Sequence, residues 1–169
     1  MTYREAINLG EKVLNMADVA DAKIDAWLLL EMVCKIDRSF YYLHMEDEVA
    51  EEQLSEYEIA LRKRAEHVPL QYIVGEAEFM GLKFKVNSNV LIPRQDTETL
   101  VEEALKVVKP GMKVLDLCTG SGCIIVSIVH NIPEVEGVAT DISKQALLVA
   151  KENAKLNQVS VTFEICLTM

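Results

Sequence analysis

The first seventy residues repeat apolar side chains at the spacing of amphipathic helices. Ala6, Leu9 and Val13 recur every three or four positions, so a helix would carry them on a single face. Thr2 and Glu5 form the sequence pattern of a capping box, in which each side chain bonds the other residue's backbone N–H. Residues 1–72 are therefore predicted to form an all-helical domain.

Two further helices are predicted in that domain. Asp21 is placed to cap the second helix. Pro69 is placed to stop the third, just after the basic run 62–64, whose positive charge suits a helix C-terminus. The apolar positions are Ile24, Trp27, Leu28 and Val33 in the second helix, and Leu54, Tyr57, Ile59 and Leu61 in the third.

The pattern changes to a period of two between residues 73 and 93. Phe84 and Val86 alternate with Lys83 and Lys85 after Gly81. Such alternation is typical of a strand with one buried face. We predict a β-hairpin here that acts as a linker between two domains.

Residues 94–169 alternate helix-like and strand-like segments. Asp96 is placed to cap a helix that Pro110 and Gly111 end. Strands are predicted at 113–118, 136–141 and 159–165, with helices at 123–132 and from the cap Ser143 to Asn157. This order predicts a parallel sheet with right-handed crossovers, the first half of a doubly wound α/β fold. The strand at 113–118 would be an unpaired apolar edge, which promotes association.

The charge distribution narrows the classes of partner. The chain has a formal net charge of −10, and residues 1–72 alone hold 8 Lys/Arg against 15 Asp/Glu. Phosphate backbones repel a strongly acidic chain, so direct nucleic-acid binding is not expected. The acidic domain could dock a basic protein, although ordinary solvated helix faces explain the same charges.

Cysteine spacing and the character of the N-terminus bear on metal binding and on the location of the protein. The four cysteines form no CxxC pair, and no Cys/His cluster has zinc-ligand spacing, so no metal site is predicted. The charged, amphipathic N-terminus is unlike a signal sequence, and no apolar run approaches membrane-spanning length. These features favour reduced thiols and a cytoplasmic protein.

The stretch DLCTGSGC, from Asp116 to Cys123, follows a predicted strand and opens a predicted helix. Its two glycines permit a tight turn and the close approach of a ligand. A ligand in such a fold lies beyond the carboxyl ends of the strands, and Asp141 ends the next strand. A carboxylate there can accept hydrogen bonds from both hydroxyls of a ribose, so a nucleoside cofactor is predicted.

Two nucleoside cofactors compete for this loop. NAD needs GxGxxG for its pyrophosphate, and either register here lacks one glycine. S-Adenosylmethionine has no phosphate and needs an acidic or carbonyl group near its amino group, which Asp116 supplies. The loop therefore favours S-adenosylmethionine over an NAD-linked oxidoreductase. A purely structural turn with a buried aspartate is the remaining explanation.

Two motifs share the stretch from Val68 to Leu105, PLQYIVG near its start and LIPRQDTE further on. With this pair the chain resembles the HemK/PrmC family of protein-glutamine methyltransferases. The later LDLCTGSGCIIVSI and ATDISKQALLVAKENAKLN match the family's order and spacing. The resemblance implies a helical domain that helps recognise peptide-chain release factors, a hairpin linker and a Rossmann-like methyltransferase domain. It also implies S-adenosylmethionine-dependent methylation of the glutamine in the release factors' Gly-Gly-Gln loop.

The resemblance also assigns site residues by position. Arg94, Thr97 and Glu98 would lie near the cofactor, with Arg94 held by a carboxylate. Cys118 replaces the family's usual glycine and is tolerated if it keeps an ordinary strand φ. Asp141 would bind the ribose. The expected cofactor-binding residues are Asp116, Cys118, Thr119, Gly120, Ser121, Gly122 and Asp141.

The family's acceptor motif, Asn-Pro-Pro-Tyr after a fourth strand, is absent from this sequence. In the family it would align the weakly nucleophilic glutamine amide for in-line methyl transfer. No catalytic residue is therefore assigned in this chain, which we expect to be the front portion of an enzyme, inactive by itself and prone to self-association through its sheet edge. The alternative is a non-catalytic cofactor- or protein-binding remnant of the family. Leu167 and Met169 stand where the family has a polar or acidic residue near the adenine.

Overall fold

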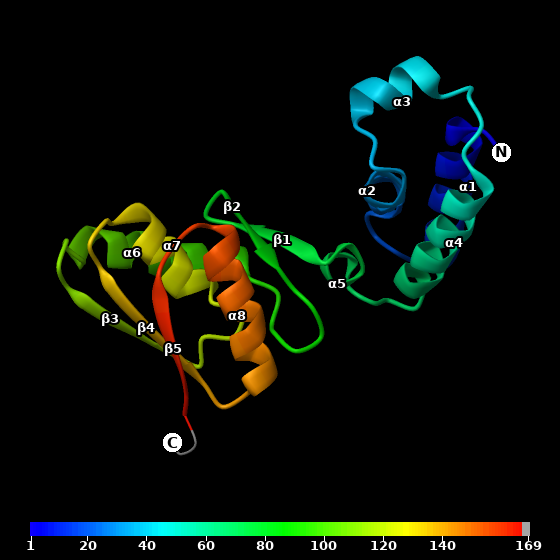
Figure 1. Ribbon diagram of the computed structural model, residues 1–169. Coiled ribbons are helices and arrows are strands. Elements are labelled where there is room, and N and C mark those ends of the chain that lie inside the picture. The colour runs from blue at the N-terminus through cyan, green and yellow to red at the C-terminus, as the bar shows by residue number, and fades with distance from the viewer. Residues whose placement is uncertain (167–169) are drawn as a thin grey trace. The chain divides into compact units, whose positions relative to one another are not determined.

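The computed structural model describes residues 1–166. The chain divides into two compact units, Met1–Val74 and Gly75–Met169, whose elements are labelled in Figure 1. The first unit is helical, and the second combines helices with two separate sheets. The predicted α/β class, with helices first and a parallel sheet after them, is therefore confirmed.

Helices alone build the first unit, and the predicted capping box opens it. Thr2 Oγ1 accepts from Glu5 N at 3.2 Å, and Glu5 Oε2 accepts from Thr2 N at 2.9 Å. α2 packs against α1, α4 and α5. The bounds are α1 Tyr3–Met16, α2 Ala22–Cys34, α3 Arg38–His44, α4 Glu51–Ala65 and α5 Leu70–Val74.

Several details predicted for these helices are wrong. Ile24 is 55% exposed and Ile59 is 49% exposed, although Trp27, Tyr57 and Leu61 are buried as expected. α2 is enclosed by three other helices, so its buried face is set by their arrangement rather than by its own period. Its fully buried positions include Ala26, Leu29 and Leu30. The sequence also predicted neither α3 nor α5.

Two caps differ from the predictions as well. Asp21 occupies the N-cap of α2, but its side chain makes no capping hydrogen bond. Arg94, not Asp96, occupies the N-cap of α6, and Asp96 lies in the first turn. By contrast, the predicted cap of α8 is confirmed, because Ser143 Oγ accepts from Ala146 N at 3.1 Å.

The second unit contains the predicted hairpin and three parallel strands. β1 pairs antiparallel with β2, and the other sheet has the order β3-β4-β5 with both pairings parallel. The bounds are β1 Glu76–Phe79, β2 Leu82–Lys85, α6 Gln95–Val107, β3 Lys113–Leu117, α7 Cys123–Asn131, β4 Glu136–Asp141, α8 Lys144–Leu156 and β5 Val161–Ile165. Because the strands are parallel, their carboxyl ends share one edge of the sheet.

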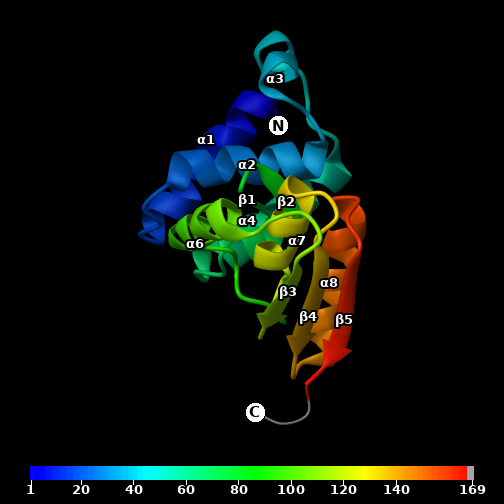
Figure 2. The ribbon, with the colours of Figure 1, turned by 90° about the vertical axis from the view of Figure 1, so that its left-hand side faces the viewer.

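Among residues 1–166, helices cover one face of the parallel sheet and leave the other uncovered. α7 contacts β3 and β4, and α8 contacts β4 and β5; both helices lie on the same side, behind the strands in Figure 2. Leu115 and Leu117, which point to the opposite face, are 59% and 64% exposed. Within the described residues, β3 is an edge strand that pairs only with β4, as the sequence predicted.

The hairpin belongs to the covered side of the second unit. β2 contacts α8, and Phe79 and Phe84 are buried in the same core as Ile125 and Ala139. Residues 73–93 thus contribute to the second unit's core from residue 75 onward. None of the helices among residues 1–166 is both long and apolar enough to cross a membrane.

Candidate functional site

The loop between β3 and α7 lies at the carboxyl edge of the sheet. Its backbone φ is positive at three alternate residues, +59° at Cys118, +56° at Gly120 and +80° at Gly122. Thr119 N donates to Thr140 O at 2.9 Å, which ties the loop to β4, and Gly122 N donates to Thr119 O at 2.9 Å. The loop is therefore a tight turn with a defined path.

Cys118 does not have the ordinary strand φ on which its tolerance was made conditional. Its φ of +59° lies in the left-handed region, where a Cβ crowds the following carbonyl oxygen and costs roughly 1–2 kcal/mol. The cause is the turn itself, which must redirect the chain within a few residues from β3 into α7. A glycine at this position would avoid the strain.

The two glycines of the loop serve different purposes. A Cβ built on Gly122 would lie 3.1 Å from the Cβ and 3.3 Å from the Cα of Ala150, so this glycine lets α8 pack against the loop. A Cβ on Gly120 would meet no atom within 4 Å. The space beside Gly120 is open, as the backbone approach of a ligand requires.

Asp141, at the end of β4, is buried and fixes the loop. Its Oδ2 accepts from Gly120 N at 2.9 Å, and its Oδ1 accepts from Ser143 N at 2.8 Å. A carboxylate offers about four lone-pair sites, so each oxygen retains acceptor capacity. The predicted proximity of Asp141 to the glycine loop is thus present as a direct contact.

Asp116, near the end of β3, faces the same loop. Its Oδ2 accepts from Thr119 Oγ1 at 2.6 Å, and the amide of Ile125 also bonds its carboxylate. Burial raises the pKa of Asp116 above its usual value, the two hydrogen bonds oppose that change, and the neighbouring charge of Asp141 adds to it. The carboxyl group is therefore held in a place where its ionised form is costly.

Thr119 and Ser121 complete the loop. Both side chains are buried, at 7% and 3% exposure, and they point into the turn rather than outward. Thr119 bonds Asp116, and Ser121 bonds the thiol of Cys123. These two residues shape the loop, and any contact of theirs with a cofactor remains a prediction.

The motif residues Arg94, Thr97 and Glu98 lie at the start of α6. Glu98 Oε1 accepts from Met80 N at 2.6 Å, which ties the tip of the β1–β2 hairpin to this helix. Arg94 is exposed, and within residues 1–166 it forms no ion pair, so the carboxylate partner expected for it is not found. A position near the cofactor remains a prediction for all three.

Sequence reasoning missed one residue that contacts the loop. Asn153 of α8 is completely buried, and its Nδ2 donates to Ser121 O at 2.9 Å. A signal was available, because Asn153 shares the face of α8 that carries Ala146, Leu147, Ala150 and Ala154, all of them buried. A polar residue on an apolar helix face normally has hydrogen-bonding partners.

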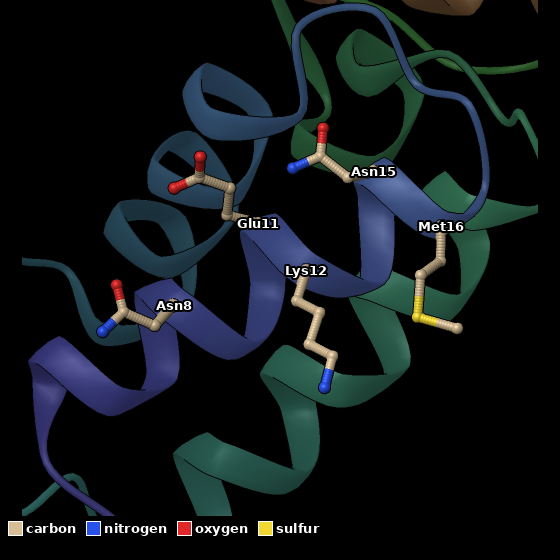
Figure 3. Close-up of a pocket in the computed structure, with 5 residues that line it drawn as sticks. All are labelled: Asn8, Glu11, Lys12, Asn15 and Met16. Carbon is tan, nitrogen blue, oxygen red and sulfur yellow. The ribbon is translucent and has the colours of Figure 1, made fainter.

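Two surface hollows formed by described residues lie away from this loop. One of about 540 Å³ is lined by Asn8, Glu11, Lys12, Asn15 and Met16, all on the outer side of α1 (Figure 3). Another of about 600 Å³ lies where α7 and α8 end, at the edge of the sheet opposite the loop, and includes Val129, Pro133 and Leu156. Neither offers a cluster of chemical groups like that at the loop. Leu167 and Met169 lie outside the described residues.

Comparisons with protein families divide the chain at the same region as the fold does. Residues 5–75 match the family model described as the PrmC N-terminal domain. Residues 95–169 match the model described as ribosomal protein L11 methyltransferase (PrmA). The two matches fall on the helical unit and on the part of the second unit that carries the loop.

Curated relatives match across almost the whole chain. A release factor glutamine methyltransferase from Moorella thermoacetica is 40% identical over 157 residues, which are 92% of this chain and 56% of the relative. The protein of the same name from Clostridium acetobutylicum is 43% identical over 155 residues, 90% of this chain and 54% of the relative. The chain therefore spans just over half the length of these relatives.

Among solved structures, a tRNA (uracil-54, C5)-methyltransferase from Pyrococcus abyssi, in complex with S-adenosyl-L-homocysteine, is similar to part of the chain. The identity is 17%, the TM-score is 0.47, and the match covers 54% of this chain and 23% of that one.

Proposed function

We propose that this chain, a relative of the HemK/PrmC release factor glutamine methyltransferases, binds S-adenosylmethionine at the loop 116–122 and serves in methylation of a release factor. The resemblance to that family, inferred from the sequence motifs, is confirmed by the matches along both units. One structural observation carries the proposal: the open space beside Gly120 lies next to the backbone amide that Asp141 holds.

The groups around the loop suit this cofactor. Asp141 has acceptor capacity left for the ribose hydroxyls, and Asp116 offers a carboxylate for the amino group. S-Adenosylmethionine carries positive charge on its sulfonium and its ammonium, which two neighbouring carboxylates attract. The pyrophosphate of NAD is anionic and would be repelled by the same pair. The charges and the glycine spacing thus favour the same cofactor.

The reaction itself is proposed for a whole protein of which this chain resembles the first part. The chain spans 56% of the Moorella relative and contains no Asn-Pro-Pro-Tyr sequence. We assign cofactor binding to residues 94–169 and recognition of the release factor to the helical residues 1–72. The chain by itself is expected to be inactive, because nothing in it would hold the glutamine amide in line with the methyl group. Its site of action would be the cytoplasm, where translation occurs.

Calorimetric titration tests the cofactor. The chain should bind S-adenosylmethionine and S-adenosylhomocysteine and should not bind NAD. Gly120→Ala should weaken binding about tenfold or more, since 1.4 kcal/mol of lost contact suffices for a factor of ten. Gly111→Ala is the matched control, because Gly111 also has a positive φ, +81°, with no atom within 4 Å of its Cβ position, but lies before β3. Binding of NAD alone would overturn the proposal.

A chimera tests the acceptor. This chain would be joined to the remaining C-terminal part of the Moorella relative and incubated with labelled S-adenosylmethionine. Release factor and ribosomal protein L11 would be offered in separate reactions, because the match at residues 95–169 names the latter. Label in the release factor glutamine is expected with the chimera and not with the chain alone. Label in L11 only would contradict the assigned substrate.

Self-association is proposed from the open face of the sheet. Leu115 and Leu117 are 59% and 64% exposed, on a strand that pairs on one side only among residues 1–166. Sedimentation velocity should show oligomers that the double variant Leu115→Glu, Leu117→Glu converts to monomer. Leu148→Glu is the control, since Leu148 is 55% exposed on α8, on the other side of the sheet. A monomeric unmodified chain would refute this proposal.

If the chain binds a protein partner but no cofactor, and the chimera is inactive, the non-catalytic, protein-binding remnant of the family becomes the better description. A chain that binds cofactor but yields an inactive chimera would be the cofactor-binding form of that alternative.

A further inference from the structure

Asn153 links two segments of the second unit that are far apart in the sequence. Its Oδ1 accepts from Lys85 N at 2.6 Å, and its Nδ2 donates to Lys85 O at 3.0 Å. The second hydrogen of the same amide goes to Ser121 O at 2.9 Å. The side chain thus joins strand β2 to the glycine loop, and both of its donor hydrogens are used.

The contact with Ser121 acts on the conformation of the loop. The Ser121 carbonyl belongs to the same peptide unit as Gly122 N, which donates to Thr119 O at 2.9 Å. One peptide plane is therefore held from both of its sides. This plane joins Ser121 to Gly122, next to Gly120. The φ values of the two glycines are +56° at Gly120 and +80° at Gly122. Because glycine is flexible, the local sequence alone only weakly determines this loop conformation.

The burial of Asn153 indicates that its contact with Ser121 helps to determine the local structure. Its exposure is 0%, and its neighbours on the α8 face are Ala146, Ala150 and Ala154. An alanine or leucine there would continue the apolar face, but the Ser121 and Lys85 backbone groups would lose their partner. A buried polar side chain with all its partners satisfied specifies one arrangement of the groups around it.

We propose that Asn153 is a positioning residue of the loop 116–122, which holds the loop in its ligand-ready conformation and couples that conformation to strand β2. The proposal goes beyond the proposed function, since it concerns how the loop is held; only its consequence for cofactor affinity rests on that function. The three hydrogen bonds of the Asn153 side chain all go to backbone groups of this chain, so the proposed role is to position the loop.

Asn157, one turn further along α8, provides the matched control. Its Nδ2 donates to Lys83 O at 2.9 Å and to Asn153 O at 3.0 Å. It therefore ties the same helix to the same hairpin strand, but no contact joins its side chain to the loop in the described part of the chain. Asn157→Ala removes a hairpin contact and leaves the loop contact intact.

Two variants of Asn153 separate positioning from simple loss of packing. Asn153→Ala removes all three hydrogen bonds and leaves a small cavity. Asn153→Asp keeps the shape and can still accept from Lys85 N, but it cannot donate to Lys85 O or Ser121 O. If the alanine variant fails to fold, the same measurement is made on the nearly isosteric aspartate variant.

The measurement is residue-resolved amide hydrogen exchange on the cofactor-free chain. In both Asn153 variants, the Gly120 and Gly122 amides should exchange about tenfold faster relative to the amides of central strand β4. In Asn157→Ala the same ratio should stay within about twofold of the unmodified chain. A merely structural role would raise the exchange of loop and strand together. An unchanged ratio in the Asn153 variants would therefore overturn the proposal.

A second readout uses S-adenosylhomocysteine. Its affinity should fall about tenfold in Asn153→Asp and remain unchanged in Asn157→Ala. If the unmodified chain does not bind this ligand, the proposed function fails, while the exchange ratios still decide the role of Asn153.

Discussion

Buried or half-buried carboxylates occur in both units, but their partners differ. In the helical unit, Asp25 Oδ2 accepts from Arg64 Nε at 2.7 Å, and Arg64 Nη1 also donates to Val68 O at 3.2 Å. In the second unit, the partners of Asp116 and Asp141 among residues 75–166 are a hydroxyl and backbone amides. No lysine or arginine of residues 1–166 forms an ion pair with either.

The difference separates an acid that supports the fold from acids available to a ligand. The charge of Asp25 is compensated within the chain, so the pair ties α2 to α4 and needs nothing further. The charges of Asp116 and Asp141 are close together and have no cation. Holding them there costs stability, and such unpaired groups gather at functional sites. This arrangement of charges is consistent with the binding of a cationic cofactor, as proposed above.

The largest effect is expected from breaking the compensated pair. Arg64→Met should lower the free energy of unfolding by about 3–5 kcal/mol, because it leaves Asp25 buried without a partner. Fluorescence of Trp27, the single tryptophan, reports the helical unit during urea unfolding. Arg62→Met is the control: Arg62 is 74% exposed in its pair with Glu58, and its loss should cost at most about 1 kcal/mol. Equal losses would show that Asp25 does not depend on Arg64.

Asp141→Asn should give the next largest effect. Its amide nitrogen cannot accept, so either Gly120 N or Ser143 N loses its acceptor. If Asp141 binds the ribose as proposed, one ribose hydroxyl loses its partner as well. Calorimetric titration should show that the affinity for S-adenosylhomocysteine falls about a hundredfold, since each 1.4 kcal/mol of lost binding energy is a factor of ten. Glu136→Gln, at the other end of β4 and exposed, should leave the affinity unchanged. An unaltered affinity in Asp141→Asn would remove Asp141 from the site.

Asp116→Asn should make the stability of the chain depend less on pH, although the same variant should bind the cofactor more weakly. The folded pKa of Asp116 is raised by burial, so the unfolded chain ionises first as pH rises, and stability is lost between the ordinary pKa and the raised one. The asparagine variant lacks this loss, while its amide oxygen still accepts from Thr119. Urea unfolding at several pH values from the acid range to neutrality should therefore show a flatter profile.

The same variant should bind more weakly. If the Asp116 carboxylate binds the cofactor's ammonium group as proposed, its removal should reduce the affinity about tenfold. If the variant binds the cofactor more weakly and its stability depends less on pH, then Asp116 contributes to binding at the expense of stability. A steeper loss of stability toward neutrality than in the unmodified chain would contradict the sign of the pKa change.

The smallest effect is expected at Cys118. Glycine relieves the strain that the positive φ imposes on residue 118, so Cys118→Gly should stabilise the chain by about 1 kcal/mol. The measurement is the shift of the unfolding midpoint of the second unit. Cys118→Ser keeps the Cβ and should change little. If glycine is no more stable than serine, the left-handed conformation of residue 118 does not cost what its geometry implies.

Much of the fold follows from local patterns. Alternation of Phe84 and Val86 with lysines predicts β2, and the apolar run before Asp116 predicts β3. Their positions are confirmed within a residue or two. Short elements without a clear period, α3 and α5, could not be predicted, since seven and five residues hold too few turns to show one. Ile24 and Ile59 lie outside the core because packing, not period, selects the buried face.

The sequence by itself determined the order of the strands and long helices from β1 to β5. It also determined the meeting of Asp141 with the glycine loop, because parallel strands bring their carboxyl ends to one edge. Only the tertiary structure decided how that loop is held. The bonds from Thr119 N to Thr140 O, from Gly120 N to Asp141 and from Asn153 to Ser121 O come from β4 and α8. These elements approach the loop from more than twenty residues away, so their influence is not encoded in any local pattern.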